Sequence, residues 1–569
     1  MVFCFAAYIV AYFTYGRFLG RKIFKLDPDK LVPSKEFADG IDYVPSKKII
    51  IFGHHFTSIA GTGPIVGPAI GIIWGWLPAV LWIVFGSIFM GAVHDLGALV
   101  VSLRNQGKSI SDITDKYINR RIKFIFFAVV FLSLLIVLAI FGVVIAVVFA
   151  RFPTSVLAVW LQIPIAVAMG YMIYKKNANI LFSTIAAVAC MYVTIWLGSK
   201  YPIQMPNIGT MPPTGIWTII LLIYAFVAST LPVTTLLQPR DYINAWQLFI
   251  MMALLIVAAV VSIFTKSMPL VAPMLNTSVP DAPPIFPFLF ITIACGAISG
   301  FHSLVASGTS PKQIEKEPDA LFVGYGSMLI ESVLALLVII CVAAGIGLGY
   351  KTADGTLLLA NQAWLHHYSS WSGAEGLTAN ISAMVIGASN MMSSLGISES
   401  LGIAIMGVFI ASFAGTTLDT AARIQRYVIS ELAVSLHLPK FTNRYTATAF
   451  AVITAAILAF STGADGTGAK LLWPLFGSVN QLLAALALLV VTLYLKRKGG
   501  LKLLVTLIPC VIMLVITVWA LVINIKGFIG TKDYKLTVIG SLILTLALWM
   551  VVEAVYMLFA PSPPQSPEN

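Results

Sequence analysis

Charged residues are scarce in this 569-residue sequence. They make up 10% of it, whereas about a quarter of the residues in a soluble globular protein are charged. Hydrophobic residues account for 59%, and apolar runs of about 20 residues, enough for one membrane crossing each, recur along the chain. The composition therefore excludes a water-soluble protein and predicts an all-α polytopic membrane protein. The net charge of +12 lies mainly in short loops, which favours the positive-inside bias over nucleic-acid binding.

Cysteine is scarce as well, and the motifs of metal and haem sites are missing. The five cysteines lie in apolar runs without CxxC spacing, which predicts neither a disulfide framework nor a zinc site. There is no HExxH motif, and no two predicted helices each carry two histidines at the spacing of a bis-histidine haem site. We therefore expect no cofactor and no metal. The alternative function, a membrane-embedded metal- or haem-binding redox protein that uses the seven histidines, lacks these signatures.

Hydropathy predicts about 15 crossings. They lie near residues 2–19, 50–73, 76–102, 123–149, 154–174, 179–198, 216–237, 246–269, 287–309, 320–350, 376–421, 445–461, 471–495, 501–525 and 536–559. We count 376–421 as one net crossing, because its first part, "LTANISAMVIGASNMMSSLG", is small and polar enough to be a bent or re-entrant piece. Two full crossings are the alternative. The first helix, within residues 1–20, is expected to be a retained span, and the proline-rich tail 561–569 to be disordered.

Basic residues alternate between the two sides of these spans. Loops 20–48, 103–122, 175–176, 312–316, 423–444 and 496–498 carry most of the lysines and arginines. Loops 270–286 and 351–375 carry almost none. The positive-inside rule then places the N-terminus outside and the C-terminus in the cytoplasm.

The second span, "FGHHFTSIAGTGPIVGPAIG" (52–71), has a membrane-spanning length but an interrupted pattern. Its core, Gly61, Thr62, Gly63 and Pro64, combines two glycines with a proline that suits the first turn of a new helix. Irregular backbone inside a membrane survives where it lines a cavity or is buried in protein. We therefore predict a broken helix whose restarted half offers the amides near Ile65 and Val66 to a carboxylate. A simple proline kink with close glycine packing is the alternative.

A second break is predicted at Ser229, Thr230 and Pro232, within the seventh apolar segment. The second and seventh segments run in opposite directions, and paired broken helices in inverted repeats are typical of secondary transporters. The expected repeats are 49–200 and 215–425, with an additional helix within 1–20 and additional helices in 445–560. Gly61 to Pro64 and Ser229, Thr230 and Pro232 are thus the candidate substrate-binding residues.

Four stretches resemble the carbon starvation protein A family. They are the quoted 52–71, "AISGFHSLVASGTSPKQIEKEPDA" (297–320), "GYGSMLIES" (324–332) and "LLWPLFGSVNQLLAALAL" (471–488). The resemblance covers nearly the whole chain from "DGIDYVPSKK" (39–48) onward. It implies a leucine-transporter-like fold and a carrier in the cytoplasmic membrane of a bacterium or archaeon. Its partners would be the lipid bilayer, a peptide or small carboxylate such as pyruvate, and H⁺ or Na⁺, without nucleic acid.

Titratable residues inside the spans are candidates for ion coupling, because burying them in a membrane is costly. His54 and His55 precede the first break; one of them could carry a proton, and an interfacial position is the alternative. Asp95, preceded by His94, is an intramembrane carboxylate, for which an ion pair with a neighbouring helix is the alternative. Glu331 is the other intramembrane carboxylate, and it could be a proton carrier or a partner for His302.

Ser299, His302 and Ser303 are expected to share one helical region, with the two serines on one face. The serines suit sodium or simple helix packing, and the histidine suits a proton. Proton-coupled relatives of the leucine-transporter fold often carry a lysine on the fifth helix of the repeat. The expected fifth helix here, "NILFSTIAAVACMYVTIWLG" (179–198), has none. Asp419 and Arg423 are predicted to form an i,i+4 salt bridge, with gating as the second interpretation.

Overall fold

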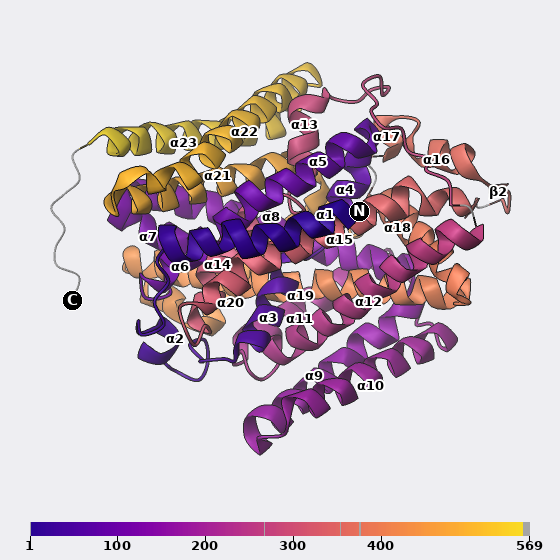
Figure 1. Ribbon diagram of the computed structural model, residues 1–569, viewed down its shortest axis with the longest axis horizontal. Helices are drawn as coiled ribbons and strands as arrows, with labels where there is room; N and C mark the ends of the chain where they lie inside the picture. The colour runs from indigo at the N-terminus through magenta and orange to yellow at the C-terminus, as the bar shows by residue number, and fades with distance from the viewer. Residues whose placement is uncertain (1, 267, 353, 375–376, 561–569) are drawn as a thin grey trace.

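The computed structural model describes residues 2–266, 268–352, 354–374 and 377–560, and the predicted disordered tail 561–569 lies outside them. Nearly all regular structure in the described residues is helical; the short hairpin of β1 (Tyr350–Lys351) and β2 (Leu357–Leu358) is the exception. The long helices run roughly side by side across the molecule (Figure 1). The prediction of an all-α polytopic membrane protein is confirmed.

Twelve helical stretches of the described residues are long and apolar enough to cross a membrane unbroken. They are Val2–Ile23 (α1, Val2–Ala11, with its π-helical continuation), Trp76–Leu103 (α5, Trp76–Gly86; η4, Ser87–Gly91; α6, Ala92–Leu103), α8 (Arg120–Arg151), Pro153–Lys176 (with α9, Val156–Lys176), α10 (Ile180–Lys200), α11 (Pro213–Thr230), Leu237–Thr265 of α12 (Leu237–Lys266), Leu321–Leu348 (with α15, Ser327–Ala343), α19 (Glu399–Ser435), Gly468–Arg497 (with α21, Trp473–Arg497), Gly500–Gly530 (with α22, Leu504–Gly530) and α23 (Tyr534–Phe559). The higher count of about 15 crossings stays a prediction.

The break expected after Ile59 is present. α3 (Lys48–Ile59) and α4 (Gly63–Gly71) meet at an angle of 43°, with Pro64 in the first turn of α4. The glycines are needed for close approach: a Cβ on Gly61 would lie 2.3 Å from Oγ1 of Thr417, and one on Gly63 would lie 2.2 Å from Sγ of Cys295. The interruption therefore serves tight packing against neighbouring elements.

The second break lies elsewhere than predicted. α11 ends at Thr230 and α12 begins at Leu237, so Pro232 lies in the turn between two spans. The residue before a proline favours extended backbone, and Leu231 (ψ 153°) ends the helix accordingly. The broken partner of α3 and α4 is instead formed by α13 (Ile285–Thr292) and α14 (Gly300–Gly308), joined by the non-helical residues 293–299.

The helices pack in two matching sets. The counterparts are α3 with α12 and α13 with α21; α4 with α15 and α14 with α6; α8 with α11 and α19 with α20 (Arg444–Ala459); and α7 (Ile110–Tyr117) with α8 and α18 (Leu377–Met392) with α19. The two sets run in opposite directions, because Ser46, just before α3, pairs with Ile314, just after α14. The repeats expected over 49–200 and 215–425 stay a prediction, and we propose from this packing that they extend over 48–266 and 285–497, with five helices each. The inserted α9–α10 hairpin, at the edge of the molecule in Figure 1, explains the offset.

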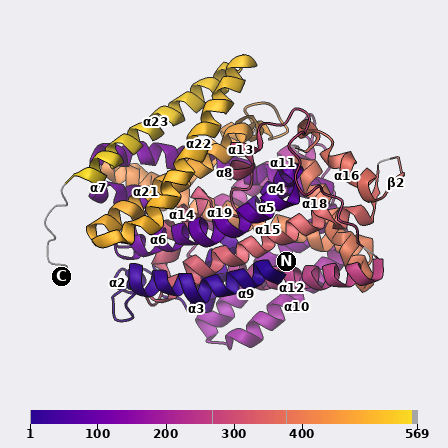
Figure 2. The same cartoon turned by 45° about the horizontal axis from the view of Figure 1, so that its top comes forward.

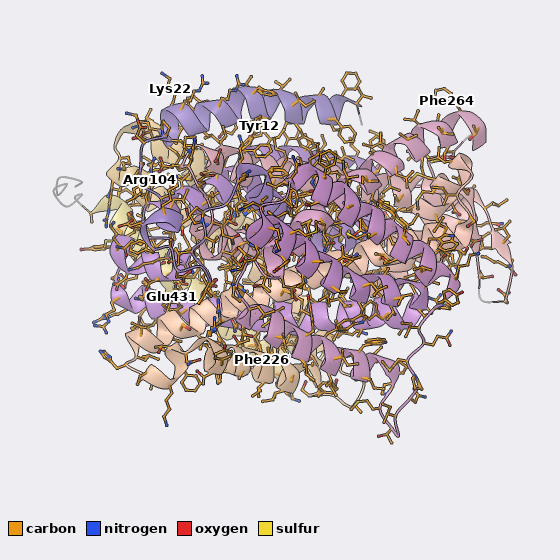
Figure 3. The ribbon with its side chains drawn as sticks, turned by 90° about the horizontal axis from the view of Figure 1, so that it is seen from below. Tyr12, Lys22, Arg104, Phe226, Phe264 and Glu431 are labelled. Carbon is orange, nitrogen blue, oxygen red and sulfur yellow. The ribbon has the colours of Figure 1, made fainter. Side chains whose placement is uncertain are left out.

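The single net crossing expected for 376–421 stays a prediction, and the described part of this range, from 377 on, contains α18 and the start of α19. Of the described helices there, α19 is long and apolar enough to cross a membrane. The shorter α18 packs against α19 and α4. Asn390 of α18 donates hydrogen bonds to the carbonyls of Gly345 and Gly349, which fixes this short helix beside the end of α15. In Figure 3, Lys22, Arg104 and Glu431 gather at one end of the molecule and Phe264 lies at the other. Contacts between Arg423 and Asp42, and between Ser46 and Ile314, join the basic loops 20–48, 312–316 and 423–444 on this side.

The packing at Gly63 gives a stability prediction. Replacing Gly63 with Ala places a methyl group against Cys295, and overpacking of this kind costs about 1–3 kcal/mol. We expect a lower thermal unfolding midpoint for G63A in detergent, with partial recovery in G63A/C295G. Gly142 in α8 has open space around its Cα, so G142A is the control and should unfold like the wild type. Equal midpoints for G63A and G142A would contradict the close packing.

Candidate functional site

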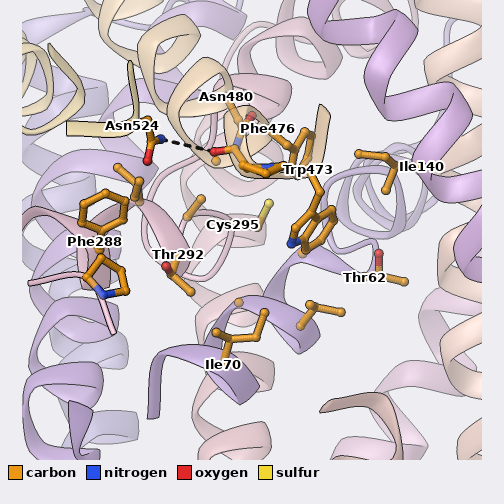
Figure 4. A pocket seen from close by; sticks show the side chains of 18 of the residues that line it. Thr62, Ile70, Ile140, Phe288, Thr292, Cys295, Trp473, Phe476, Asn480 and Asn524 are labelled. Atoms are coloured by element: carbon orange, nitrogen blue, oxygen red, sulfur yellow. Dashed lines mark hydrogen bonds between the residues drawn. The ribbon is translucent and has the colours of Figure 1, made fainter. Parts of the chain in front are cut away.

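A cavity of about 720 Å³ lies where the two broken helices meet (Figure 4). Thr62 and Gly63 from the first break and Thr292 and Cys295 from the second line its inner part. Other helices complete the wall with Phe141 of α8, Thr417 of α19, Trp473, Phe476 and Asn480 of α21, and Asn524 of α22. The cavity reaches the exposed residues Asp281 and Thr531 at the side opposite the basic loops.

The cavity wall is mainly apolar and aromatic. Asp281 and Asp533, both in the outer loops, are the charged residues among those that line it. Deeper in, the polar groups are uncharged: the hydroxyls of Thr62 and Thr417, the thiol of Cys295 and the amide of Asn480. A wall with a few oriented polar groups is typical of a binding site for a small organic molecule.

The predicted substrate residues divide into two groups. Gly61, Thr62, Gly63 and Pro64 form the break beside the cavity, and Thr62 and Gly63 line it. The other group, from the turn after α11, is not part of the cavity wall. Ser229 faces Thr448 of α20 at 3.5 Å, and the hydroxyl of Thr230 donates to the carbonyl of Val227.

The amides proposed for anion binding are already bonded. The backbone N–H groups of Ile65 and Val66 donate to the carbonyl of Thr62 at 3.1 and 2.8 Å. The carbonyl of Thr62 thus accepts the first backbone hydrogen bonds of α4. The prediction of open amides at these two residues is wrong.

Three of the predicted coupling residues form one buried group. Nδ1 of His302 lies 3.1 Å from Asp95, and its Nε2 lies 3.3 Å from Glu331. His94 adds a contact of 2.8 Å to the second oxygen of Asp95. All four side chains are fully buried, and they come from α6, α14 and α15. The sequence offered Asp95 or Glu331 as the partner of His302, and the fold places both carboxylates beside this imidazole.

The two serines near His302 do not form the expected pair. Ser299 lies before the first turn of α14 with extended backbone, so it shares no helix face with Ser303. Its hydroxyl exchanges hydrogen bonds with the side-chain amide of Asn480, while Ser303 donates to the carbonyl of Gly300. The break in the helix before Gly300 separates them.

The adjacent histidines have different partners. Nδ1 of His54 lies 2.6 Å from Asp241, and Nδ1 of His55 lies 2.7 Å from the hydroxyl of Ser310. Asp241 also accepts a hydrogen bond from Arg240. Arg240 and Asp241 are not among the predicted site residues, because they lie between the predicted spans 216–237 and 246–269, whereas the structure places them in the buried start of α12.

Asp419 pairs with Arg240 rather than with Arg423. Arg240 donates to Asp419, and the hydroxyl of Tyr224 donates to the same carboxylate at 2.8 Å. Arg423 instead reaches Asp42 at 2.6 Å and the carbonyl of Leu231. The predicted i,i+4 salt bridge is therefore wrong, because both residues find partners on other elements.

Asp42, in the loop before α3, links that loop to α19. Arg423 and Arg426 both donate to its carboxylate, at 2.6 and 2.8 Å. Burial alone raises the pKa of Asp42, but the positive charges of Arg423, Arg426 and Lys312 outweigh it and lower this pKa to about 2. Asp42 thus stays ionised across the physiological range.

Comparison with known proteins gives consistent matches. A family model described as carbon starvation protein CstA matches residues 1–520. The peptide transporter CstA of Campylobacter jejuni is 33% identical over 554 residues, covering 90% of this chain and 78% of that protein. The pyruvate/proton symporter BtsT of Escherichia coli is 32% identical over 577 residues, covering 91% of this chain and 80% of that protein.

Among solved structures, a manganese transporter of Eremococcus coleocola aligns over 91% of this chain and 99% of its own, with a TM-score of 0.52. Its sequence is 13% identical, so this similarity concerns the fold alone. The expected leucine-transporter-like fold is thereby supported by a solved transporter.

The link through Asp42 predicts a stability effect that is independent of pH near neutrality. Replacing Asp42 with Asn leaves two buried guanidinium groups without their carboxylate, at a cost of about 1–3 kcal/mol. Because the folded pKa is lowered, the contribution of Asp42 is present above its unfolded pKa near 3.9 and is lost only as the pH falls toward 2. Thermal unfolding of D42N should show the same loss at pH 5.5 and 8.5. The exposed Asp29 gives the control D29N, and a D42N loss confined to one pH would count against this link.

Proposed function

The chain belongs to the carbon starvation protein CstA family, and we propose from this that it imports short peptides or pyruvate by cation symport, with the proton as the coupling ion. The family and its relatives are membrane transporters rather than enzymes. The observation that carries the proposal is the cavity at the meeting point of two broken helices, with a buried group of one imidazole and two carboxylates behind the second break. The redox alternative has no support from the relatives.

The size of the cavity favours a short peptide over pyruvate. At about 720 Å³ it falls within the range of pockets that enclose organic ligands far larger than pyruvate. Its aromatic wall, with Phe141, Trp473 and Phe476, suits apolar side chains. Asn480 and Thr62 supply neutral hydrogen-bonding groups for a peptide backbone. Because E. coli BtsT, a relative of similar identity, carries a pyruvate name, both substrates belong in the test.

The arrangement around His302 favours protons over sodium. An imidazole between Asp95 and Glu331 can gain or lose a proton without moving, and it lies in a fully buried position. The hydroxyls of Ser299 and Ser303, the candidate sodium ligands, are bonded to Asn480 and Gly300. In addition, α12 is the fifth helix of the inferred first repeat, and it carries the cation Arg240. The helix expected in that place, 179–198, has no lysine of the kind that proton-coupled relatives carry there.

His302 communicates with the cavity through the second break. Ser299 is three residues before it and bonds Asn480, which lines the cavity. The same amide accepts the backbone N–H of Phe301 at 3.0 Å. A substrate that displaces Asn480 thus changes the support of the helix that holds His302, which couples substrate to proton.

The chain is placed in the cytoplasmic membrane of a bacterium or archaeon, with the N-terminus outside and the basic side inside. In this orientation the cavity opens outward. The inner side is closed by Asp42 with Arg423 and by Arg240 with Asp419, which gives Asp419 and Arg423 a gating role with partners other than each other.

Proton coupling through His302 has a direct test in proteoliposomes. We expect H302Q to lose stimulation of uptake by an inward proton gradient, on the order of tenfold, while substrate exchange without a gradient continues. S303A is the matched control one residue away, and it should keep the response. Wild-type uptake that needs sodium and ignores the proton gradient would show that the ion is wrongly assigned.

The preference between substrates is tested in the same vesicles. Uptake of a radiolabelled dipeptide with apolar side chains should saturate and be inhibited by other dipeptides. Pyruvate should compete weakly, because it fills a small part of the cavity. Saturable pyruvate uptake that no dipeptide inhibits would overturn the assignment of the cavity to peptides.

A further inference from the structure

A second group of buried charges lies on the inner half of the molecule, apart from His302. It contains Asp241 and Asp419, which both accept from Arg240, and His54, which contacts Asp241. These side chains come from α3, α12 and α19, and all are buried. Tyr224 of α11 completes it with hydrogen bonds to Arg240 and Asp419.

The charges in this group do not balance unless a proton is present. Arg240 supplies one positive charge against two carboxylates, which leaves one negative charge unmatched when His54 is neutral. An unmatched buried charge is strongly unfavourable. A proton on His54, 2.6 Å from Asp241, removes the imbalance.

Among the described residues, the other cations near His54 have partners of their own. Lys48, on the same helix, lies 3.8 Å from Asp319. On its own helix, His55 faces Ser310. Arg423, one turn beyond Asp419, is bonded to Asp42 and to the carbonyl of Leu231. On α14 and α15, which also pack against α3, His302 and Glu331 face each other. Lys312, which follows α14, lies over the ring of Tyr427.

His54 lies where its proton can affect the contact between α3 and α12. α3 is the half of the first broken helix on the basic side, and its long contact with α12 closes that side. A Cβ on Gly53 would lie 3.1 Å from the ring of Tyr242 and 3.4 Å from Cβ of Ala245, so the two helices are in close contact beside the charges. Beside the charges, a hydrogen bond from the hydroxyl of Thr57 to the backbone carbonyl of Asp241 also joins α3 to α12.

We propose that His54 is a second proton site and that its proton, by matching the charges of this group, keeps α3 packed on α12 while the inner side is closed. The site rests on the proposed function, of which it is the inner gate. When the proton leaves, the group keeps an unmatched negative charge that water can stabilise. α3 then moves away from α12 to admit that water, which opens the cavity to the cytoplasm.

The test measures the separation of α3 from α12 without any transport assay. Ala245 is 1% exposed and faces Gly53, so A245C is a small reporter that reacts only when the two helices part. Vesicles with the basic side outward are treated with a membrane-impermeant maleimide. Rates are divided by those of the denatured protein at the same pH, and the background of native cysteines comes from the parent chain.

In A245C, labelling should rise on the order of tenfold between pH 5.5 and 8.5, as a single buried charge is lost. A245C/H54N should react rapidly at both values, because the negative charge is always unmatched. Adding D241N to that variant removes the excess carboxylate and should restore slow labelling at both values. H55N, at the neighbouring buried histidine, is the matched control and should keep the pH dependence.

Labelling of A245C that does not change with pH would overturn the proposal. So would loss of the pH dependence in H55N but not in H54N. If H54N is not recovered in membranes, D241N alone decides the matter, since its charges are matched without a proton and its labelling should be slow and independent of pH. H302Q should keep the labelling response even where it ends proton-driven uptake, so the two proposals fail separately.

Discussion

Every backbone polar group inside a membrane needs a hydrogen-bond partner within the protein, and the two helix breaks depend on how this demand is met. At the first break, the hydroxyls of Thr416 and Thr417 donate to the carbonyls of Thr57 and Ser58. At the second, Asn480 accepts the N–H of Phe301. The two unwound segments persist because α19 and α21 satisfy them. The same contacts fix the walls of the cavity, so the site and the support of the breaks are one set of interactions.

The buried charged side chains likewise have their partners within the protein. The group around His302 joins α6, α14 and α15, and the group around Arg240 joins α3, α11, α12 and α19. Each broken helix therefore carries one histidine that faces a carboxylate on a neighbouring helix. This places titratable contacts on both broken helices, in the inner half of the molecule behind the cavity. Proton movement and helix movement are thereby tied to the same residues.

Much of the fold could be predicted from the sequence, because long apolar runs and basic loops report directly on membrane crossing. The first break was predictable since "GTGP" combines glycine freedom with a proline. The second was not: residues 293–299 contain no proline, and Pro232 gave a stronger local signal at an ordinary turn. The inserted α9–α10 hairpin shifted the expected repeats, which hid the correspondence of α12 with α21. Asp95, His302 and Glu331 were recognised as buried and costly, whereas the partners of His54, Asp419 and Arg423 depend on contacts between distant segments.

The C-terminal pair α22 and α23 lies outside both repeats, on the opposite side of the molecule from α9 and α10 (Figure 2). Even so, Asn524, Thr531 and Asp533 from this pair line the outer part of the cavity. An inverted repeat by itself gives a carrier two equivalent ends. Here, among the described residues, the end of the cavity opposite the basic loops has walls that have no counterpart at the basic end. Different surfaces therefore set the half-saturating concentration of a substrate at the two ends. The two values should differ even without an ion gradient.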